Sequence, residues 1–160
     1  MSPNEQEIQE RHFVEEFGLL YEELGGSRMM GRIVGMMLIC DPPHQSSQQL
    51  AEYLGASRGT ISTLTRQLLQ VGLLQKVPMP GSRATYFRME DTGWSDMVQA
   101  RIAYLKILQG VADRGLSILE GAPPERRKRL EHFKAFYDYL EREFQPIIDR
   151  WGARDPEEAT

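Results

Sequence analysis

The stretch from Ser46 to Gln70 predicts two short amphipathic helices joined by a tight turn, and this pattern limits the fold more than any other part of the sequence. Ser46 stands three residues before Gln49, which is the spacing of a capping box, and begins a helix that Gly55 closes. Ser57 follows two residues later and caps the second helix. Two helices joined by so short a glycine-containing connection are typical of a helix-turn-helix.

Directly after Gly72 the period of the apolar residues changes from about 3.6 to about 2, which predicts a β-hairpin. Residues 73–79 are predicted as one strand and residues 84–89 as the returning strand. The turn between them, Pro80-Gly81-Ser82-Arg83, consists of residues that favour turns. A hairpin behind a helix-turn-helix is a wing, so the sequence predicts a mainly α-helical, winged helix-turn-helix protein.

Amphipathic helices are predicted on both sides of this motif. Residues 5–24 and 27–40 precede it, and Gly31 and Gly35 leave a smooth strip for close contact with another helix. A helix over residues 94–120 follows it, and the last helix begins after Pro123-Pro124. Large apolar residues on this last helix recur in steps of three and four, a seam that favours pairing with a partner helix and hence dimerisation. The seam comprises Leu130, Phe133, Tyr137, Leu140, Phe144, Ile147 and Trp151.

The expected organisation therefore has four parts, two of which serve dimerisation. Residues 1–24 form an N-terminal helix that contributes to the dimer, and residues 25–91 form the winged helix-turn-helix. Residues 92–152 form a helical dimerisation region, and residues 153–160 form a flexible tail.

The second helix of the helix-turn-helix has an unusual polar face. With Ile61 at the centre of the buried side, about 100° per residue places Leu64, Thr65 and Leu68 beside it. The opposite face carries no carboxylate and little bulk, as a helix in the major groove of DNA requires. It comprises Gly59, Thr63, Arg66 and Gln70, with Ser62 and Gln67 on the flanks.

Basic residues extend this candidate surface into the wing. Arg66 is able to reach a guanine edge or a phosphate oxygen, and we expect the guanine-edge role. Arg83 at the hairpin tip is expected in the minor groove, and Lys76 and Arg88 are expected on phosphates. From Arg28 to Arg88 the sequence has seven basic and two acidic residues, although the whole chain has a net charge of −4. A basic middle between acidic ends favours a polyanion as the partner.

Several other classes of protein are disfavoured. No signal-peptide pattern and no run of about 18 apolar residues is present, so we expect a cytoplasmic protein with no membrane segment. The single cysteine, Cys40, excludes an internal disulfide, and burial is favoured over a redox role. His12, His44 and His132 share no metal-ligand spacing, and no catalytic motif appears, so we predict no metal, no cofactor and no enzymatic activity.

The segments FVEEFGLLYEELGGSRMMGRIVGMMLI, SSQQLAEYLGASRGTISTLTRQLLQVGLL and PGSRATYFRM, in this order, resemble MarR-type winged-helix regulators over about residues 13–89. The resemblance is closest to the GbsR-like branch, named after the glycine-betaine-synthesis repressor. It implies a homodimeric transcription regulator, of the repressor type, whose two wings straddle a palindromic operator. By position it implies recognition-helix contacts from Ser57, Arg58, Thr60, Ser62, Thr63 and Arg66 and a wing contact from Arg83. The common MarR wing has an acidic residue before its tip arginine, where this chain has Gly81-Ser82.

The sequence leaves alternatives open. Aromatic residues, among them Phe17, Tyr21, Trp94 and Tyr104, suit either a pocket for a small-molecule effector or simple packing of a dimer core. The run from Arg126 to Arg129 is interpreted as a solvated or salt-bridging face rather than a DNA contact. Two other functions remain: a winged-helix protein-interaction module without operator binding, and a ligand or redox sensor whose output is not transcription.

Overall fold

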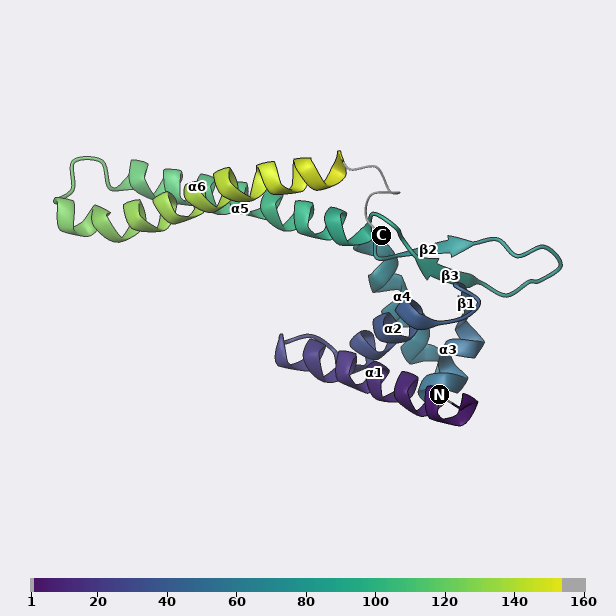
Figure 1. Cartoon of the computed structure of the whole chain (residues 1–160). Helices are drawn as coiled ribbons and strands as arrows, with labels where there is room; N and C mark the ends of the chain where they lie inside the picture. The colour runs from purple at the N-terminus through teal and green to yellow at the C-terminus, as the bar shows by residue number, and fades with distance from the viewer. Residues whose placement is uncertain (1, 154–160) are drawn as a thin grey trace. The chain divides into compact units, whose positions relative to one another are not determined.

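The computed structural model describes residues 2–153, and within these it divides into two compact units. The first unit, Met1–Gly93, contains four helices and a small sheet, and the second, Trp94–Thr160, is built from two long helices (Figure 1). The expected tail lies outside the described residues except for Ala153, which caps the last helix.

Helices α1 (Pro3–Glu23) and α2 (Arg28–Ile39) form a closely packed pair at the start of the first unit. Ser2 caps α1 in a capping box with Glu5, and Ser27 caps α2 by accepting a hydrogen bond from the Met30 N–H. The predicted glycine strip is confirmed, because a Cβ added at Gly35 would lie 2.8 Å from the Cβ of Phe17. Only glycine allows the two backbones to approach this closely.

Helices α3 (Ser47–Leu54) and α4 (Arg58–Gln70) form the predicted helix-turn-helix. The Ser46 N–H donates to Oε1 of Gln49 at 2.8 Å, and the Gln49 N–H donates to Oγ of Ser46 at 3.1 Å, which completes the capping box. Gly55 ends α3 in the left-handed conformation, with φ of 61°, and Ser57 caps α4. The caps thus fix the turn between the two helices.

The wing is larger than the predicted hairpin, because a third strand joins it. Strand β1 (Gln45–Ser46) pairs antiparallel with β3 (Tyr86–Met89), which also pairs antiparallel with β2 (Leu74–Val77). The order in the sheet is β1-β3-β2. Both hairpin strands are shorter than predicted, and the loop between them projects away from the helices of the first unit (Figure 1).

The core of the first unit lies where α2, α3, α4 and the sheet meet. Its fully buried side chains include Ile33, Leu50, Ile61, Leu68 and Leu73, and Phe87 closes it from the sheet. Burying side chains of this size stabilises the fold by roughly 1.5–3 kcal/mol each. This core holds α4 and the wing against one scaffold, which fixes the geometry of the surface they present.

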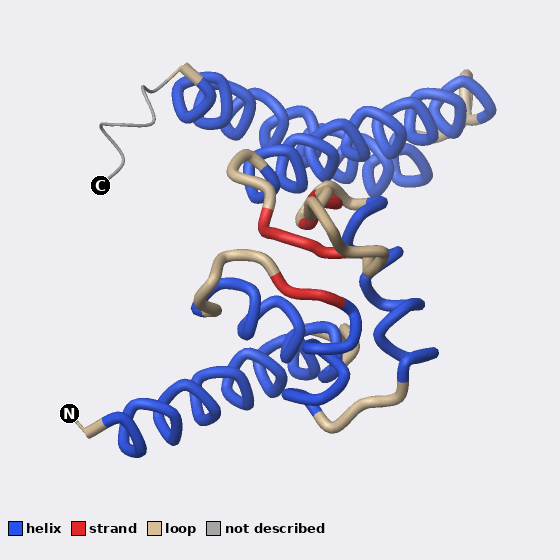
Figure 2. The backbone as a smooth tube through the Cα atoms, turned by 90° about the vertical axis from the view of Figure 1, so that its right-hand side faces the viewer, coloured by secondary structure: helices blue, strands red, loops and turns tan. Residues whose placement is uncertain are grey.

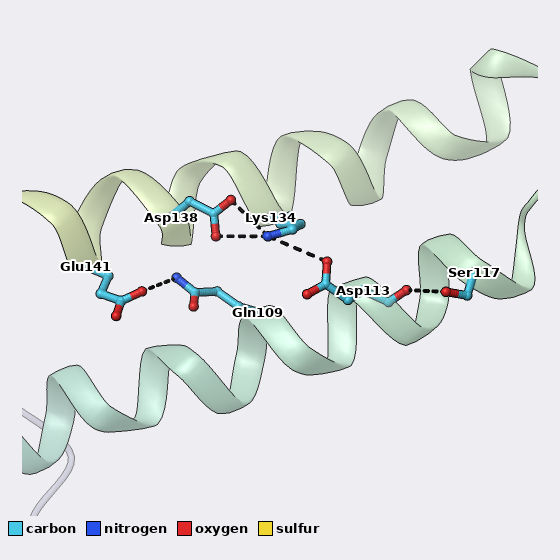
Figure 3. A network of polar contacts seen from close by, with 6 residues as sticks. All are labelled: Gln109, Asp113, Ser117, Lys134, Asp138 and Glu141. Carbon is cyan, nitrogen blue, oxygen red and sulfur yellow. Dashed lines mark hydrogen bonds and ion pairs between the residues drawn. The ribbon is translucent and has the colours of Figure 1, made fainter.

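The second unit is an antiparallel helical hairpin of α5 (Gly93–Ile118) and α6 (Pro124–Gly152), side by side in both views (Figures 1 and 2). Leu130 of α6 fits against Gly115, where an added Cβ would lie 2.5 Å from its Cδ2 atom. Polar pairs lie further along: Gln109 donates to Glu141 at 2.9 Å, and Lys134 contacts Asp113 at 3.5 Å (Figure 3). These pairs define the register of the hairpin.

Candidate nucleic-acid interface

The outer face of α4 is exposed as the helical period predicts. Ile61, Thr65 and Leu68 are buried beneath it, and the Thr65 hydroxyl donates to the Ile61 carbonyl at 2.8 Å, so this polar side chain is satisfied inside the core. The predicted contact residues of the helix are all exposed: Ser57, Arg58, Gly59, Thr60, Ser62, Thr63, Arg66 and Gln67. The face therefore presents short donors and acceptors without a carboxylate.

The first turn of α4 is prepared for an acceptor from outside the chain. Oγ of Ser57 accepts a hydrogen bond from the Thr60 N–H at 3.0 Å, and the two side-chain hydroxyls lie 2.8 Å apart. Within residues 2–153 the N–H groups of Arg58 and Gly59 have no such acceptor. Free N–H groups at a helix start attract phosphate oxygens, which adds to the polar face described above.

The wing places its three basic residues at three different positions. Arg83 is exposed in the loop, beside Gly81, whose φ of 78° favours glycine, and Ser82, whose Oγ accepts from the Ala84 N–H at 3.1 Å. Lys76 pairs across the ladder with Phe87 and shares its face of the sheet. Arg88 follows Phe87 along the strand and so lies on the opposite face.

Lys76 and Arg66 line one open hollow of about 200 Å³ between α4 and the sheet. Ser47 and Thr85 also line it, although the sequence did not single them out. The Ser47 N–H donates to the Thr85 carbonyl at 3.3 Å, so strand pairing brings together residues far apart in the chain. No local pattern in the sequence carries that information.

The charge of this surface is positive because its basic residues lack acidic neighbours. No Asp or Glu occurs between Glu52 and Glu90, and in the described part of the chain no carboxylate pairs with Arg58, Arg66, Lys76, Arg83 or Arg88. Arg28 and Arg32 were counted in the basic middle, yet both pair with Glu15, at 3.1 and 2.7 Å. The positive surface therefore comes from α4 and the wing, not from α2.

The predicted dimerisation seam is only partly covered within one chain. Leu130, Tyr137 and Leu140 are half-buried, whereas Phe133, Phe144, Ile147 and Trp151 are exposed. Over its described length α6 has no fully buried residue, and its contacts with α5 include ion pairs of Lys134 and Glu141. The Arg126–Arg129 run includes one ion pair, Arg127 with Glu131 at 3.2 Å.

The four aromatic residues predicted for an effector pocket lie in different units. Phe17 and Tyr21 are neighbours on α1, with ring centroids 6.2 Å apart, and face the glycine strip of α2. Trp94 and Tyr104 belong to α5 and are 37% and 52% exposed. Neither the hollow beside α4 nor a polar one between α5 and α6 is lined by any of these four. Among residues 2–153, no three His, Cys, Asp or Glu side chains gather as metal ligands would.

Cys40 is half-buried at the end of α2, where its Sγ donates to the Met37 carbonyl at 3.6 Å. Burial is the largest influence and raises the pKa of the Cys40 thiol. Since the thiolate is the reactive form, we expect alkylation at pH 7 to be slower than that of free cysteine and its rate to keep rising with pH beyond the ordinary thiol pKa, where the rate for free cysteine levels off. Following iodoacetamide labelling by mass spectrometry across pH would check this, and rapid labelling at neutral pH would contradict it.

Comparison with known proteins finds a family model and two relatives that are described as transcriptional regulators. A model of the MmpR5-like MarR family of transcriptional regulators matches residues 92–154. The HTH-type transcriptional regulator MmpR5 of Mycobacterium tuberculosis is 38% identical over 146 residues, which cover 91% of this chain and 88% of that protein. A solved structure of a transcriptional regulator is 37% identical, with 91% of this chain and 99% of that one covered and a TM-score of 0.78.

A further match has a narrower reach. Methionyl-tRNA formyltransferase of a Cyanothece species is 33% identical over 122 residues, but these cover only 34% of that enzyme. The class is defined by the fold, by the exposed face of α4 and by the two relatives that match over most of their length. It is a winged helix-turn-helix transcriptional regulator, not an enzyme. The chain belongs to the MarR family, in its MmpR5-like group. Across the described ranges, every helix is too short or too polar to span a membrane.

Proposed function

We propose that the protein is a homodimeric repressor that binds a palindromic operator in double-stranded DNA through α4 and the wing, and acts in the cytoplasm. The observation that carries the proposal is the surface formed by α4 and the β2–β3 hairpin. Its five basic residues have no carboxylate partner in the described structure, while Arg28, Arg32, Lys106 and Lys134 elsewhere are paired. Unpaired cations around a small, polar helix face suit a phosphate backbone with a groove beside it.

Apolar side chains left exposed in the second unit support the homodimer. Tyr104, Ile107 and Val111 of α5 are each at least half exposed, and Phe144 and Ile147 of α6 are 44% and 48% exposed. So many exposed large apolar residues on one helical hairpin indicate a covered surface in the working protein. A two-fold dimer would hold two copies of α4 about one turn of DNA apart, in successive major grooves.

A small-molecule effector would act on that spacing. A ligand regulates binding only if its affinity differs between dimers that present the two α4 helices at the operator spacing and dimers that do not. The aromatic residues at the ends of the chain remain the proposed source of such a pocket, with Phe17, Tyr21, Trp94 and Tyr104 as candidates. The GbsR-like branch is not supported by the relatives, which are MmpR5-like, and the proposal does not depend on it.

The rival is a winged-helix module that binds proteins instead of an operator. An α4 face made for protein contacts would gain from exposed aromatic or aliphatic anchors. Every exposed residue of α4 is a glycine, an arginine or a residue with a hydroxyl or amide side chain. The helix therefore presents no aromatic or aliphatic anchor. The unpaired basic residues favour DNA over a protein partner.

Selection of duplexes from a randomised pool, followed by fluorescence anisotropy, tests the proposal. We expect enrichment of a palindrome whose half-sites are about one helical turn apart, and an affinity for it that falls steeply as salt rises. DNA from upstream of the protein's own gene should be tested beside a scrambled duplex. If no sequence is enriched and all duplexes bind equally weakly, the protein is not an operator-binding regulator.

A further inference from the structure

The hollow between α4 and the wing has features of a site for an anion. Arg66 enters it from α4 and Lys76 from β2, and Ser62 and Thr85 also line it. Within the described residues neither cation has an ion pair, and neither of the two side-chain hydroxyls has a hydrogen-bond partner. Two positive charges that share a small volume repel each other unless an anion lies between them. The hollow therefore gathers two cations and two hydroxyls that no other side chain of the described residues engages.

The position of the hollow identifies the anion. In the complex proposed above, α4 occupies a major groove and Arg83 reaches into the neighbouring minor groove. A major groove and its neighbouring minor groove are separated by one sugar–phosphate strand. That strand would cross the protein surface between α4 and the wing, where the hollow lined by Arg66 and Lys76 lies. A phosphodiester there would receive charge-assisted hydrogen bonds from both side chains.

We propose that this hollow binds one phosphodiester of the DNA backbone, with Arg66 and Lys76 as its two cationic ligands. The inference rests on the proposed function and changes the role of one residue in it. The sequence favours a guanine-edge contact for Arg66, whereas in the structure Arg66 lines the hollow between α4 and the sheet together with Lys76. Arg66 then sets the register of the protein on DNA, and base preference comes from smaller polar side chains on the crest of the helix, such as Thr63.

Single and double alanine variants test the shared phosphate. Arg66→Ala and Lys76→Ala are each expected to weaken binding about tenfold, by the same factor for the selected operator and for a scrambled duplex. Each should also make the dependence of affinity on salt shallower, by about one phosphate contact. Because both side chains bind the same phosphate, the affinity of the double variant should fall by less than the product of the two single-variant factors.

Arg88→Ala is the matched control, since Arg88 lies on the other face of the same sheet. Whatever the effect of Arg88→Ala alone, the factor by which it lowers affinity should multiply with the factor for Arg66→Ala when the two are combined. Circular dichroism of each variant confirms the fold; all three side chains are exposed, so the substitutions leave the core intact.

Operator duplexes with a single neutral methylphosphonate locate the contact. At one position per half-site the methylphosphonate should weaken operator binding by the wild-type protein about tenfold and leave binding by the double variant unchanged. Two results would overturn the phosphate site. One is a change in base preference in the Arg66→Ala variant. The other is that every methylphosphonate position that weakens binding of the wild-type protein also weakens binding of the double variant. Both results presuppose an operator that the wild-type protein selects, so failure of the proposed function is recognised separately and beforehand.

Discussion

Gly31→Ala lowers the free energy of unfolding of the first unit by about 2–3 kcal/mol, the range of overpacking in a close contact. The new Cβ would lie 2.5 Å from the Phe17 carbonyl oxygen and 2.7 Å from the Tyr21 Cβ. The nearest of these atoms belongs to the α1 backbone and cannot rotate away. The helix pair must therefore separate, which opens the packing that Phe17 and Tyr21 make on α2.

Gly59→Ala is the matched control, because it makes the same change inside another helix. Its added Cβ meets only the Ser57 Oγ, at 3.8 Å, so the gain in helix propensity of about 0.5–1 kcal/mol should raise stability. Urea unfolding followed by far-UV circular dichroism measures both variants. Both tryptophans, Trp94 and Trp151, lie in the second unit, so their fluorescence reports that unit separately. Equal shifts in the two variants would show that the close contact of α1 and α2 has no special cost.

We expect Ile147→Asp to convert the proposed dimer to monomers and, through that, to weaken operator binding about a hundredfold or more. Ile147 is 48% exposed in one chain, so a charge there spares the folded monomer. In a two-fold dimer the substitution occurs twice, and each buried apolar side chain of this size is worth roughly 1.5–3 kcal/mol. The free energy lost with both contacts, together with the cost of burying two carboxylates, exceeds the association free energy of a dimer that forms at micromolar concentration.

Arg142→Asp controls for the added carboxylate, because Arg142 is exposed on the same helix and lies about 140° around it from Ile147. Its guanidinium contacts the ring of Tyr139, which is not part of the seam. Sedimentation velocity should give a monomer for Ile147→Asp and a dimer for both Arg142→Asp and the wild type. An intact dimer in Ile147→Asp would place the interface elsewhere. Phe144→Asp gives an independent reading, since Phe144 is also exposed in the single chain.

Much of the fold follows from local signals in the sequence. Ser27, Ser46 and Ser57 cap the helices that their spacing predicts, and Gly55 closes α3. The buried positions of α4 are those that the helical period around Ile61 selects, because one side of that helix meets a single core. The exposed candidates for DNA contact follow from the same period, since they are what remains outside.

Features made by distant parts of the chain were not accessible in this way. Strand β1 has two residues, too few for alternation to appear, and exists because Gln45 and Ser46 pair with β3. The meeting of Arg66 with Lys76 depends on where the sheet docks beside α4. Likewise, the apolar spacing of α6 predicts a seam but not which residues of the helix meet α5. The contact of α6 with α5 involves polar residues such as Lys134 and Glu141 that the apolar pattern does not include.

The polar pairs between α5 and α6 also bear on how two chains would meet. Glu141 is held by both Gln109, at 2.9 Å, and Lys106, at 3.3 Å, while Leu130 occupies the notch at Gly115. Sliding one helix by a single turn, about 5.4 Å, would break all of these contacts together. In the proposed dimer the hairpin would be a preorganised half of the interface: its shape is settled within each chain, so less conformational entropy would be lost when a second copy docks.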